Sequence, residues 1–438
     1  MPNDPDTDYT FKLNTNNTMY DLCVVGAGLI GSAAARHASL QPNIRVCLIG
    51  PEEPKERRLE SPREIFGAHY DEGRVTRCSD PDPVWATLAQ NSINRYRELE
   101  ATSGVTFYSE TGCLMSGPPG GQFMTNTQET VTSQNIQHDY LTPELLRKRF
   151  PYLNLRDTDE AIFETKNAGY ISPRGMIDAQ KRVARDNGCD VINDVVCEIS
   201  RNHDSGVRLM SVLTESGQKV EARRVLIATG SFTTFRKLLP PGREPDVTFC
   251  PLAVAKVEVS SEDVKRLGNM PSILYYGDGA PDWPEDYPRS PNRVIGIYVL
   301  PPIKYPDGKY YIKLGDFHDS VPQRLSSLEE VKAWYCTDGV TPLVTKSARL
   351  ITALTKGIKP LSYHGDHCVI TKTPTNRPYI DLVHPSLGVA IGGNGYAAKS
   401  SDEIGRIAAM LVLYGKWDSE LPVEAFKLKL KDKPNSKL

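Results

Sequence analysis

The chain has 438 residues, of which 39% are hydrophobic and 24% are charged, and its formal net charge is −2; these values favour a folded protein of two or more domains. The nearly balanced charge gives no indication of a surface for nucleic acid or anionic membrane, and the longest apolar run, around 22–35, is shorter than the roughly 18 residues that span a bilayer. The nine cysteines are scattered without a Cys-x-x-Cys pair, which argues against a disulfide framework and against a zinc site.

The first predicted element is an apolar strand at 20–25 that runs into a glycine-rich turn and then into an alanine-rich helix. In a strand–turn–helix of this kind the first glycine makes the turn, the second lets the main chain approach a pyrophosphate, and the third lets the helix pack on the strand. The helix N-terminus attracts the anion. The pattern predicts a dinucleotide site formed by Gly26, Gly28, Leu29, Ile30 and Gly31.

The second predicted strand, 45–49, lacks the acid that commonly follows it and binds the ribose. Gly50 stands at that position, and Glu52 and Glu53 follow it closely. We assign the ribose contact to Glu52, with Glu53 as the alternative.

Two later strands also end in residues suited to a nucleotide. The strand at 223–227 continues into Ala-Thr229-Gly230, a phrase common where a strand of an FAD domain passes its cofactor, and we assign Val196 to the same site. A strand at 387–391 leads through Gly392-Gly393-Asn394-Gly395 into a helix at 401–413. That helix N-terminus would stabilise negative charge on a flavin ring.

A hairpin is predicted between these pieces. The segments 292–300 and 309–315 flank Pro306-Asp307-Gly308, which is typical of a tight turn between strands. Folding about this turn brings Tyr298 close to Lys313.

The predicted fold class is α/β, with an α+β arrangement of two domains. Each domain is built from separate segments of the chain. A Rossmann-like FAD-binding domain is assembled from 20–105, 160–238 and 350–420. A substrate domain with a mainly antiparallel sheet is assembled from 106–159 and 239–349. Residues 1–19 and 421–438 are predicted to be polar tails.

The order and spacing of several phrases resemble the family of monomeric sarcosine oxidase and pipecolate oxidase-like proteins, within the D-amino-acid-oxidase-like FAD superfamily. The resemblance covers about 20–415, and the set is far more specific than any one phrase. The phrases are VVGAGLIG at 24–31, GRVTR at 73–77, ISPRG at 171–175, YVLP at 298–301, KLG at 313–315, CVITKTP at 368–374 and GGNGYAAKSS at 392–401.

The resemblance implies flavin-dependent oxidation of a secondary or N-alkyl amino acid, with O2 as acceptor and hydrogen peroxide as product, by a monomer. One alternative is a dehydrogenase that passes electrons to another acceptor, and another is a non-catalytic flavoprotein with the same fold. A nicotinamide dehydrogenase is least favoured, because the late glycine-rich turn and the cysteine phrase have no place in it.

The resemblance also implies a covalent flavin. In the family the cysteine of the Cys-x-x-Thr-x-Thr-Pro phrase bonds to the 8-methyl carbon of FAD, and Cys368 and Thr371 occupy these positions. The alternative is a free cysteine beside noncovalent FAD, since the wider superfamily includes noncovalent members.

Four further residues match family positions near the flavin and the substrate. Lys313 matches the lysine that promotes reaction with oxygen, and a solvated strand lysine is the alternative. Arg77 matches the arginine that binds the substrate carboxylate, and Arg74 matches a second arginine near the flavin; ion pairs with Asp71, Glu72 or Asp80 are the alternative for both. Tyr298 matches a pocket tyrosine, or is an ordinary half-buried strand aromatic.

The chain departs from the family pattern at three places. Lys399 lies two residues later than the family lysine that follows the last glycine-rich turn, so its assignment to the cofactor and the carboxylate depends on the fold. Phe317 replaces the pocket histidine, with His318 beside it, and Ile370 replaces a tyrosine. A more apolar pocket follows, which places sarcosine itself in doubt as the substrate.

The last residues are Ser436-Lys437-Leu438, the peroxisomal address when it is free at a C-terminus. The sequence therefore predicts a peroxisomal protein that binds the import receptor through this tripeptide, with an ordinary charged tail as the alternative.

Overall fold

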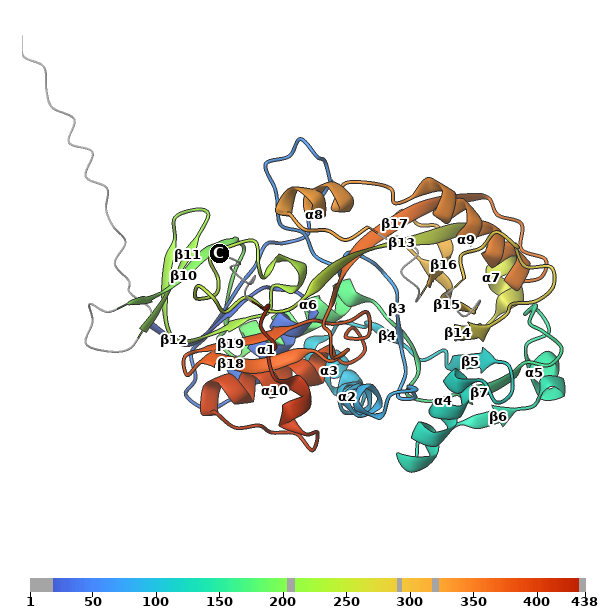
Figure 1. Cartoon of the computed structure of the whole chain (residues 1–438), viewed down its shortest axis with the longest axis horizontal. Helices are drawn as coiled ribbons and strands as arrows, with labels where there is room; N and C mark the ends of the chain where they lie inside the picture. The colour runs from blue at the N-terminus through green and yellow to red at the C-terminus, as the bar shows by residue number, and fades with distance from the viewer. Residues whose placement is uncertain (1–18, 203–208, 290–293, 317–322, 433–438) are drawn as a thin grey trace, which may run out of the picture.

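The chain folds into two large sheets that lie side by side, with helices on their outer faces (Figure 1). The computed structural model describes residues 19–202, 209–289, 294–316 and 323–432. Phe317, His318 and the tripeptide Ser436-Lys437-Leu438 lie outside these ranges. Within them, no helix has both the length and the apolar character needed to cross a bilayer.

The first sheet has a parallel centre that matches the predicted nucleotide-binding strands. Its described strands run in the order β9-β2-β1-β12-β19, with β18 antiparallel at one edge and β10 and β11 extending from β12. The bounds are β1 (Met19–Val25), β2 (Val46–Ile49), β9 (Asp190–Ile192), β10 (Val196–Asn202), β11 (Leu209–Thr214), β12 (Lys219–Ile227), β18 (Tyr379–His384) and β19 (Leu387–Ile391).

Helices cover one face of this sheet because its strands alternate apolar side chains between two cores. Leu22 and Val24 of β1 pack in a cluster with Ala34 and Ile404 of the helices, whereas Cys23 and Val25 face the other side. The helices of this half are α1 (Leu29–Ser39), α2 (Pro83–Ile93), α3 (Tyr96–Ser103), α6 (Pro173–Asp186) and α10 (Ser401–Tyr414).

The second sheet is mainly antiparallel, as predicted, and its described strands run in the order β17-β13-β16-β15-β14-β5-β7-β6. Among the described strands of this sheet, only β14 and β5 pair in parallel. The bounds are β5 (Cys113–Gly117), β6 (Asp139–Leu141), β7 (Glu160–Glu164), β13 (Thr248–Val259), β14 (Ser272–Gly277), β15 (Ile295–Lys304), β16 (Tyr310–Asp316) and β17 (Ser362–Lys372). Its helices are α4 (Gln122–Ser133), α5 (Pro143–Arg149), α7 (Ser261–Leu267), α8 (Leu328–Tyr335) and α9 (Thr341–Leu354).

The predicted hairpin is confirmed. Strands β15 and β16 pair about the predicted turn, where Gly308 has a φ of 84°. In the register, Tyr298 pairs with Gly315 and Leu300 pairs with Lys313. The two predicted pocket residues are therefore diagonal neighbours across the strands.

Two strands within the ranges predicted for the FAD-binding domain, β7 and β17, pair in the second sheet. The long strands β13 and β17 pair along eleven residues and reach from the second sheet toward the first (Figure 1). Cys368 is therefore carried by the sheet that faces the nucleotide-binding half. A small third sheet joins the halves, with order β3-β8-β4 and bounds β3 (Arg74–Thr76), β4 (Tyr108–Ser109) and β8 (Gly169–Ile171); the short 3-10 helices are η1 (Gly230–Phe232) and η2 (Val423–Phe426).

Candidate active site

A cavity of about 460 Å³ lies between the two large sheets, and nearly all of the predicted site residues line it. The glycine-rich turns come from the first sheet, and the strand residues come from the second. The predicted residues in its lining are Gly26, Gly28, Leu29, Ile30, Arg74, Arg77, Val196, Thr229, Gly230, Tyr298, Lys313, Cys368, Thr371, Gly393, Asn394, Gly395 and Lys399. One cavity thus brings together segments that are more than 370 positions apart in the sequence, from Gly26 to Lys399.

The first glycine-rich turn has the tight geometry that its spacing predicts. Gly26 has a φ of 106°, a left-handed conformation, and a Cβ there would overlap the carbonyl oxygen of Ala228. Gly31 does not line the cavity but lies beneath the turn, where a Cβ would overlap the carbonyl oxygen of Gly26. Gly28 is open, since the nearest atom to an added Cβ is His69 Nδ1 at 3.8 Å. This cradle has room for a pyrophosphate above Gly28 and at the start of α1.

We expect Gly31→Ala to lower the free energy of unfolding of the flavin-free protein by about 3 kcal/mol, because the added methyl group meets main chain that cannot turn away. Gly28→Ala is the matched control, which should cost about 1 kcal/mol or less while weakening flavin retention. Urea unfolding of both flavin-free variants measures the difference. Equal destabilisation by the two substitutions would contradict the assigned geometry.

The glutamates assigned to the ribose lie outside the cavity lining. The main-chain N–H of Glu52 donates to Asn193 Oδ1 at 2.9 Å, and the Glu53 carboxylate forms an ion pair with Arg174 at 2.6 Å. Gly50 and Pro51 do line the cavity. The ribose contact of Glu52 therefore stays a prediction that requires its side chain to turn inward.

Cys368 lies on β17 beside the cavity's cationic groups. It pairs with Leu252 of β13, and its carbonyl oxygen accepts a hydrogen bond from Trp334 Nε1 at 3.0 Å. Burial raises the pKa of the Cys368 thiol, although Arg74 and Lys313 act in the opposite direction. The unmodified side chain is thus a neutral thiol held at the cavity wall.

The threonines of the cysteine phrase connect it to the second glycine-rich turn. The main-chain N–H of Asn394 donates to the carbonyl oxygen of Thr371 at 3.0 Å, and the N–H of Thr373 donates to Asn394 Oδ1 at 2.8 Å. Asn394 has a φ of 53°, in the left-handed region. These bonds fix the position of Cys368 relative to Gly393 and Gly395.

Lys313 points into the cavity from β16. Its neighbours Ile312 and Leu314 face the opposite side and pack in the core beneath α9, as the strand alternation predicted. The Lys313 ammonium donates to the Asp71 carboxylate and, at 3.2 Å, to the carbonyl oxygen of Gly73. Burial lowers the pKa of Lys313 to about 8, and the nearby Arg74 guanidinium acts in the same direction. The solvated-lysine alternative is therefore wrong: Lys313 is 1% exposed.

Asp71 is the shared counter-ion of this part of the cavity. It forms an ion pair with Arg74 and accepts a hydrogen bond from the Tyr305 hydroxyl at 2.7 Å. Burial opposes its charge, but Lys313, Arg74 and Lys256 hold the pKa of Asp71 well below the usual range. The acid is ionised at neutral pH, so the cations around it can remain charged without water.

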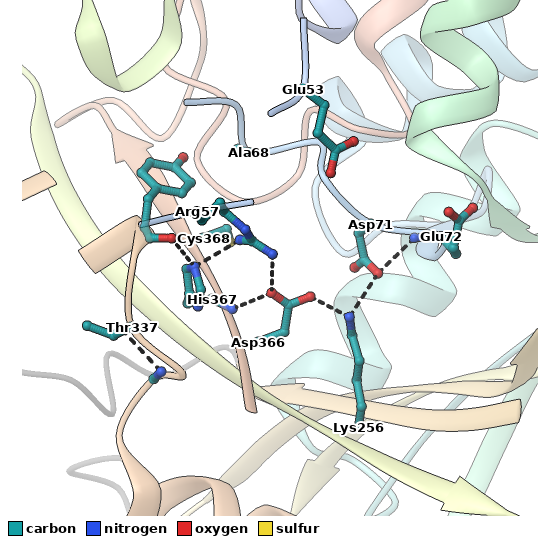
Figure 2. Close-up of polar contacts among 12 residues, drawn as sticks. Glu53, Arg57, Ala68, Asp71, Glu72, Lys256, Thr337, Asp366, His367 and Cys368 are labelled. Carbon is teal, nitrogen blue, oxygen red and sulfur yellow. Dashed lines mark hydrogen bonds and ion pairs between the residues drawn. The ribbon is translucent and has the colours of Figure 1, made fainter. Parts of the chain in front are cut away.

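An ionic chain connects Asp71 and Asp366, which both line the cavity, through Lys256 (Figure 2). Lys256 of β13 is directly opposite Lys313 in the strand register. Its Nζ lies 2.5 Å from Asp366 Oδ2 and 3.8 Å from Asp71 Oδ1, and Arg57 lies 3.6 Å from Asp366. Two buried lysines opposite each other would repel strongly, so the two aspartates are required for the sheet to form with both lysines inside.

Arg77 and Lys399 form a second cationic group at the cavity. Arg77 Nη2 lies 2.9 Å from Asp80 Oδ2, and Lys399 Nζ lies 3.1 Å from the same oxygen. The Lys399 ammonium also lies over the rings of Trp85 and Tyr396. The structure therefore places Lys399 beside Arg77 despite its offset in the sequence. The ion pairs that were the alternative for Arg74 and Arg77 do form, and both arginines still line the cavity.

Tyr298 lies on β15 and faces the cavity, with the Lys313 ammonium 5.9 Å from the centre of its ring. Gly315 is required opposite it, since an added Cβ would lie 2.5 Å from the Tyr298 hydroxyl. Ile370 lines the cavity on β17. The expected apolar contribution of Phe317 stays a prediction, because that residue lies outside the described ranges.

Sequence reasoning missed the buried acids and one buried lysine. Asp71 and Asp80 were considered only as alternative ion-pair partners, although each lies three residues from an assigned arginine. Lys256 and Asp366 gave no local signal, because their pairing arises from strand register. Asp316 also lines the cavity and is 6% exposed. A search for acids at i±3 from each assigned cation would have found the first two.

The residues that line the cavity fit FAD. The cradle at Gly26–Gly31 can accept a pyrophosphate, and the second glycine-rich turn, Cys368 and the buried cations Lys313, Arg77 and Lys399 line the same cavity. A parallel sheet with this cradle and an antiparallel sheet closing the cavity define the fold of a dinucleotide-binding protein with a second domain over the site.

Comparison with known proteins gives the family. The profile described as DAO, FAD dependent oxidoreductase, matches residues 21–411, and the chain belongs to this family of FAD-dependent oxidoreductases. It is 24% identical over 412 residues to a monomeric sarcosine oxidase of Bacillus sp., covering 93% of this chain and 95% of the relative. A monomeric sarcosine oxidase of Streptomyces avermitilis is 30% identical over 173 residues, 39% of this chain and 42% of the relative. The solved structure of NikD, described as an unusual amino acid oxidase essential for nikkomycin biosynthesis, aligns with a TM-score of 0.69 at 18% identity, covering 94% of this chain and 98% of NikD.

Proposed function

We propose that the protein is an oxidase of secondary or N-alkyl amino acids that uses FAD and O2 and acts as a monomer. The observation that carries the proposal is the pair of cationic groups in one cavity: Arg77 with Lys399, and Lys313 with Arg74. The first can hold a carboxylate, and the second can stabilise charge that develops on oxygen. The relatives described as monomeric sarcosine oxidase support the same class of donor.

The residues of the chain orient the substrate and supply charge. Arg77 presents a planar guanidinium that can take a carboxylate through parallel hydrogen bonds, with Lys399 beside it and Tyr298 on the facing strand. This clamp fixes the amine carbon relative to the cofactor. When bound, FAD supplies the two-electron chemistry: the amine carbon gives up a hydride and becomes an imine, and O2 takes the two electrons and protons to become hydrogen peroxide.

Lys313 has the position and charge to assist the reaction with oxygen. A buried ammonium lowers the energy of negative charge forming on O2, and the effect is large where water is excluded. The Asp71 carboxylate accepts a hydrogen bond from this ammonium and thereby orients it. Cys368 and Thr371 would hold the ring end of the flavin, and Thr229, Gly230 and Val196, which also line the cavity, would contact the rest of the cofactor.

A peroxide-release screen of the purified yellow protein tests the function. The substrates are N-methylglycine, N-methyl-L-tryptophan, L-pipecolate, L-proline and longer N-alkyl amino acids. We expect stoichiometric peroxide from at least one of them, and reduction of the flavin by the same compound without air. Reduction that air fails to reverse would indicate a dehydrogenase, and a flavin that no amine reduces would indicate a non-catalytic flavoprotein.

Cys368→Ser tests covalent attachment. If Cys368 forms a thioether to the 8-methyl carbon, acid precipitation of the native protein leaves the yellow colour in the pellet, and the variant releases it to the supernatant. Cys250→Ser is the matched control, because Cys250 lines the same cavity and should leave the colour in the pellet. Release of all flavin from the native protein would show noncovalent binding.

A further inference from the structure

Asp80 stands behind the Arg77 and Lys399 pair without lining the cavity itself. One carboxylate oxygen, Oδ2, contacts both cations, at 2.9 Å from Arg77 Nη2 and 3.1 Å from Lys399 Nζ. Asp80 is 1% exposed, Arg77 is 4% exposed and Lys399 is 2% exposed. Because both contacts are direct, the one acid determines the spacing of the two cations and their total charge.

The chain holds Asp80 in place from several sides. The main-chain N–H groups of Cys78 and Ser79 donate to the buried Glu164 carboxylate at 2.8 and 2.9 Å. Asp80 Oδ1 accepts from the N–H of Asp82 at 3.1 Å, just before α2. These bonds anchor the loop between β3 and α2, so Asp80 is fixed before any ligand enters.

The main chain of Lys399 is also anchored by a hydrogen bond, and one N–H donor of Arg77 is unsatisfied. The carbonyl oxygen of Lys399 accepts a hydrogen bond from the Tyr96 hydroxyl at 2.8 Å. Arg77 Nε is buried and has no hydrogen-bond partner among the described residues. An unpaired buried guanidinium N–H is costly, and a ligand acceptor beside Arg77 would satisfy it.

We propose that Asp80 is a positioning residue that fixes Arg77 and Lys399 as a two-cation clamp with a net charge of +1, so that the site selects a substrate end with one carboxylate over one with two. This inference rests on the proposed function for the role of the clamp. Two cations and one acid leave a single positive charge, which one carboxylate neutralises. A second carboxylate on the same carbon would feel the negative charge of Asp80 through the clamp and would find no counter-charge of its own.

Burial lowers the pKa of Lys399, and Arg77 acts in the same direction, whereas Asp80 raises it. Asp80 therefore favours the protonated form of Lys399, and its negative charge offsets one of the two cations of the clamp. A merely structural counter-ion would instead affect all anionic ligands alike when it is removed.

The test measures binding of two carboxylates of equal carbon number to the flavin-loaded protein at pH 7, by the change in the visible flavin spectrum. Propanoate carries one carboxylate, and malonate carries two on the same carbon. In Asp80→Asn we expect the ratio of the malonate to the propanoate dissociation constant to fall at least about tenfold relative to the native protein. Asp82→Asn is the matched control, since Asp82 is two residues away and pairs with Arg377; its ratio should match that of the native protein.

A comparison of D80N/K399Q with K399Q keeps the test decisive if Asp80→Asn fails to fold. K399Q alone leaves a net charge of zero, and we expect its ratio to be at least about tenfold higher than that of the double variant. The double variant D80N/K399Q removes one cation and one anion, restores the net charge of +1 and removes the repulsion. We expect its ratio to return to the native value within about threefold. A ratio unchanged in Asp80→Asn, a double variant whose ratio does not return, or equal ratios in K399Q and D80N/K399Q overturns the proposal.

The same measurement separates this inference from the proposed function. Neither carboxylate is oxidised, so binding can be titrated whether or not any amine reduces the flavin. A shifted ratio without amine oxidation would support the role of Asp80 and contradict the proposed oxidase. Amine oxidation with an unshifted ratio would support the oxidase and contradict the role of Asp80.

Discussion

Replacing Lys313 with methionine is expected to slow the reaction of reduced flavin with oxygen by about 10²–10³-fold, the usual effect of removing one preorganised charge from a water-excluded site. Reduction of the flavin by the amine should change little, because the carboxylate clamp at Arg77 does not involve Lys313. Methionine matches the length of the lysine stem and preserves its packing. Stopped-flow measurements of the two half-reactions, the first without air, give the comparison.

The matched control is Lys256→Met. Lys256 is also buried and shares Asp71, yet it does not line the cavity. We expect it to slow reoxidation by less than about tenfold, through a change in the field at Lys313. Equal losses in both half-reactions of Lys313→Met would contradict the role in oxygen chemistry, as would an equal effect of the two lysines.

The same lysine predicts the pH dependence of reoxidation. Burial lowers the pKa of Lys313 to about 8, so the ammonium is present below that pH and is lost as the pH rises through it. The reoxidation rate of the native protein should therefore fall above about pH 8 toward the rate of Lys313→Met. The variant itself should show no such step.

Arg77→Gln is expected to lower kcat/KM for the best amino acid found in the peroxide screen by about 10²–10³-fold, because a bidentate charged contact is lost and Asp80 remains buried beside Lys399. The measurement compares this substrate with the corresponding amine that lacks the carboxylate. That amine should be a poor substrate of both proteins and should lose less than about threefold on the substitution.

This comparison separates carboxylate binding from folding. If Arg77→Gln lowers the rate for both compounds equally, the arginine has a structural role with Asp80 and does not clamp the substrate. Flavin content, measured by absorbance for each preparation, controls for loss of the cofactor.

Much of the nucleotide-binding half was predictable because its signals are local. The strand at 387–391 has the same bounds in the structure, and the helix predicted at 401–413 extends by one residue to Tyr414. Glycine spacing and apolar strand runs depend on neighbours within a few residues, so a sequence window contains the determining information. The orientation of Lys313 followed from the same strand alternation.

The sequence by itself determined the two glycine-rich turns, the hairpin at 306–308 and the identity of the cations at the site. Only the tertiary structure decided which lysines share Asp71 and Asp80 with the two arginines and which sheet carries Cys368. The pairing of β13 with β16 and β17 places Lys256 opposite Lys313 and beside Asp366, and the packing of α10 against the first half brings Lys399 to Asp80. These contacts join residues more than 50 positions apart, and their energies depend on burial, which no local pattern records.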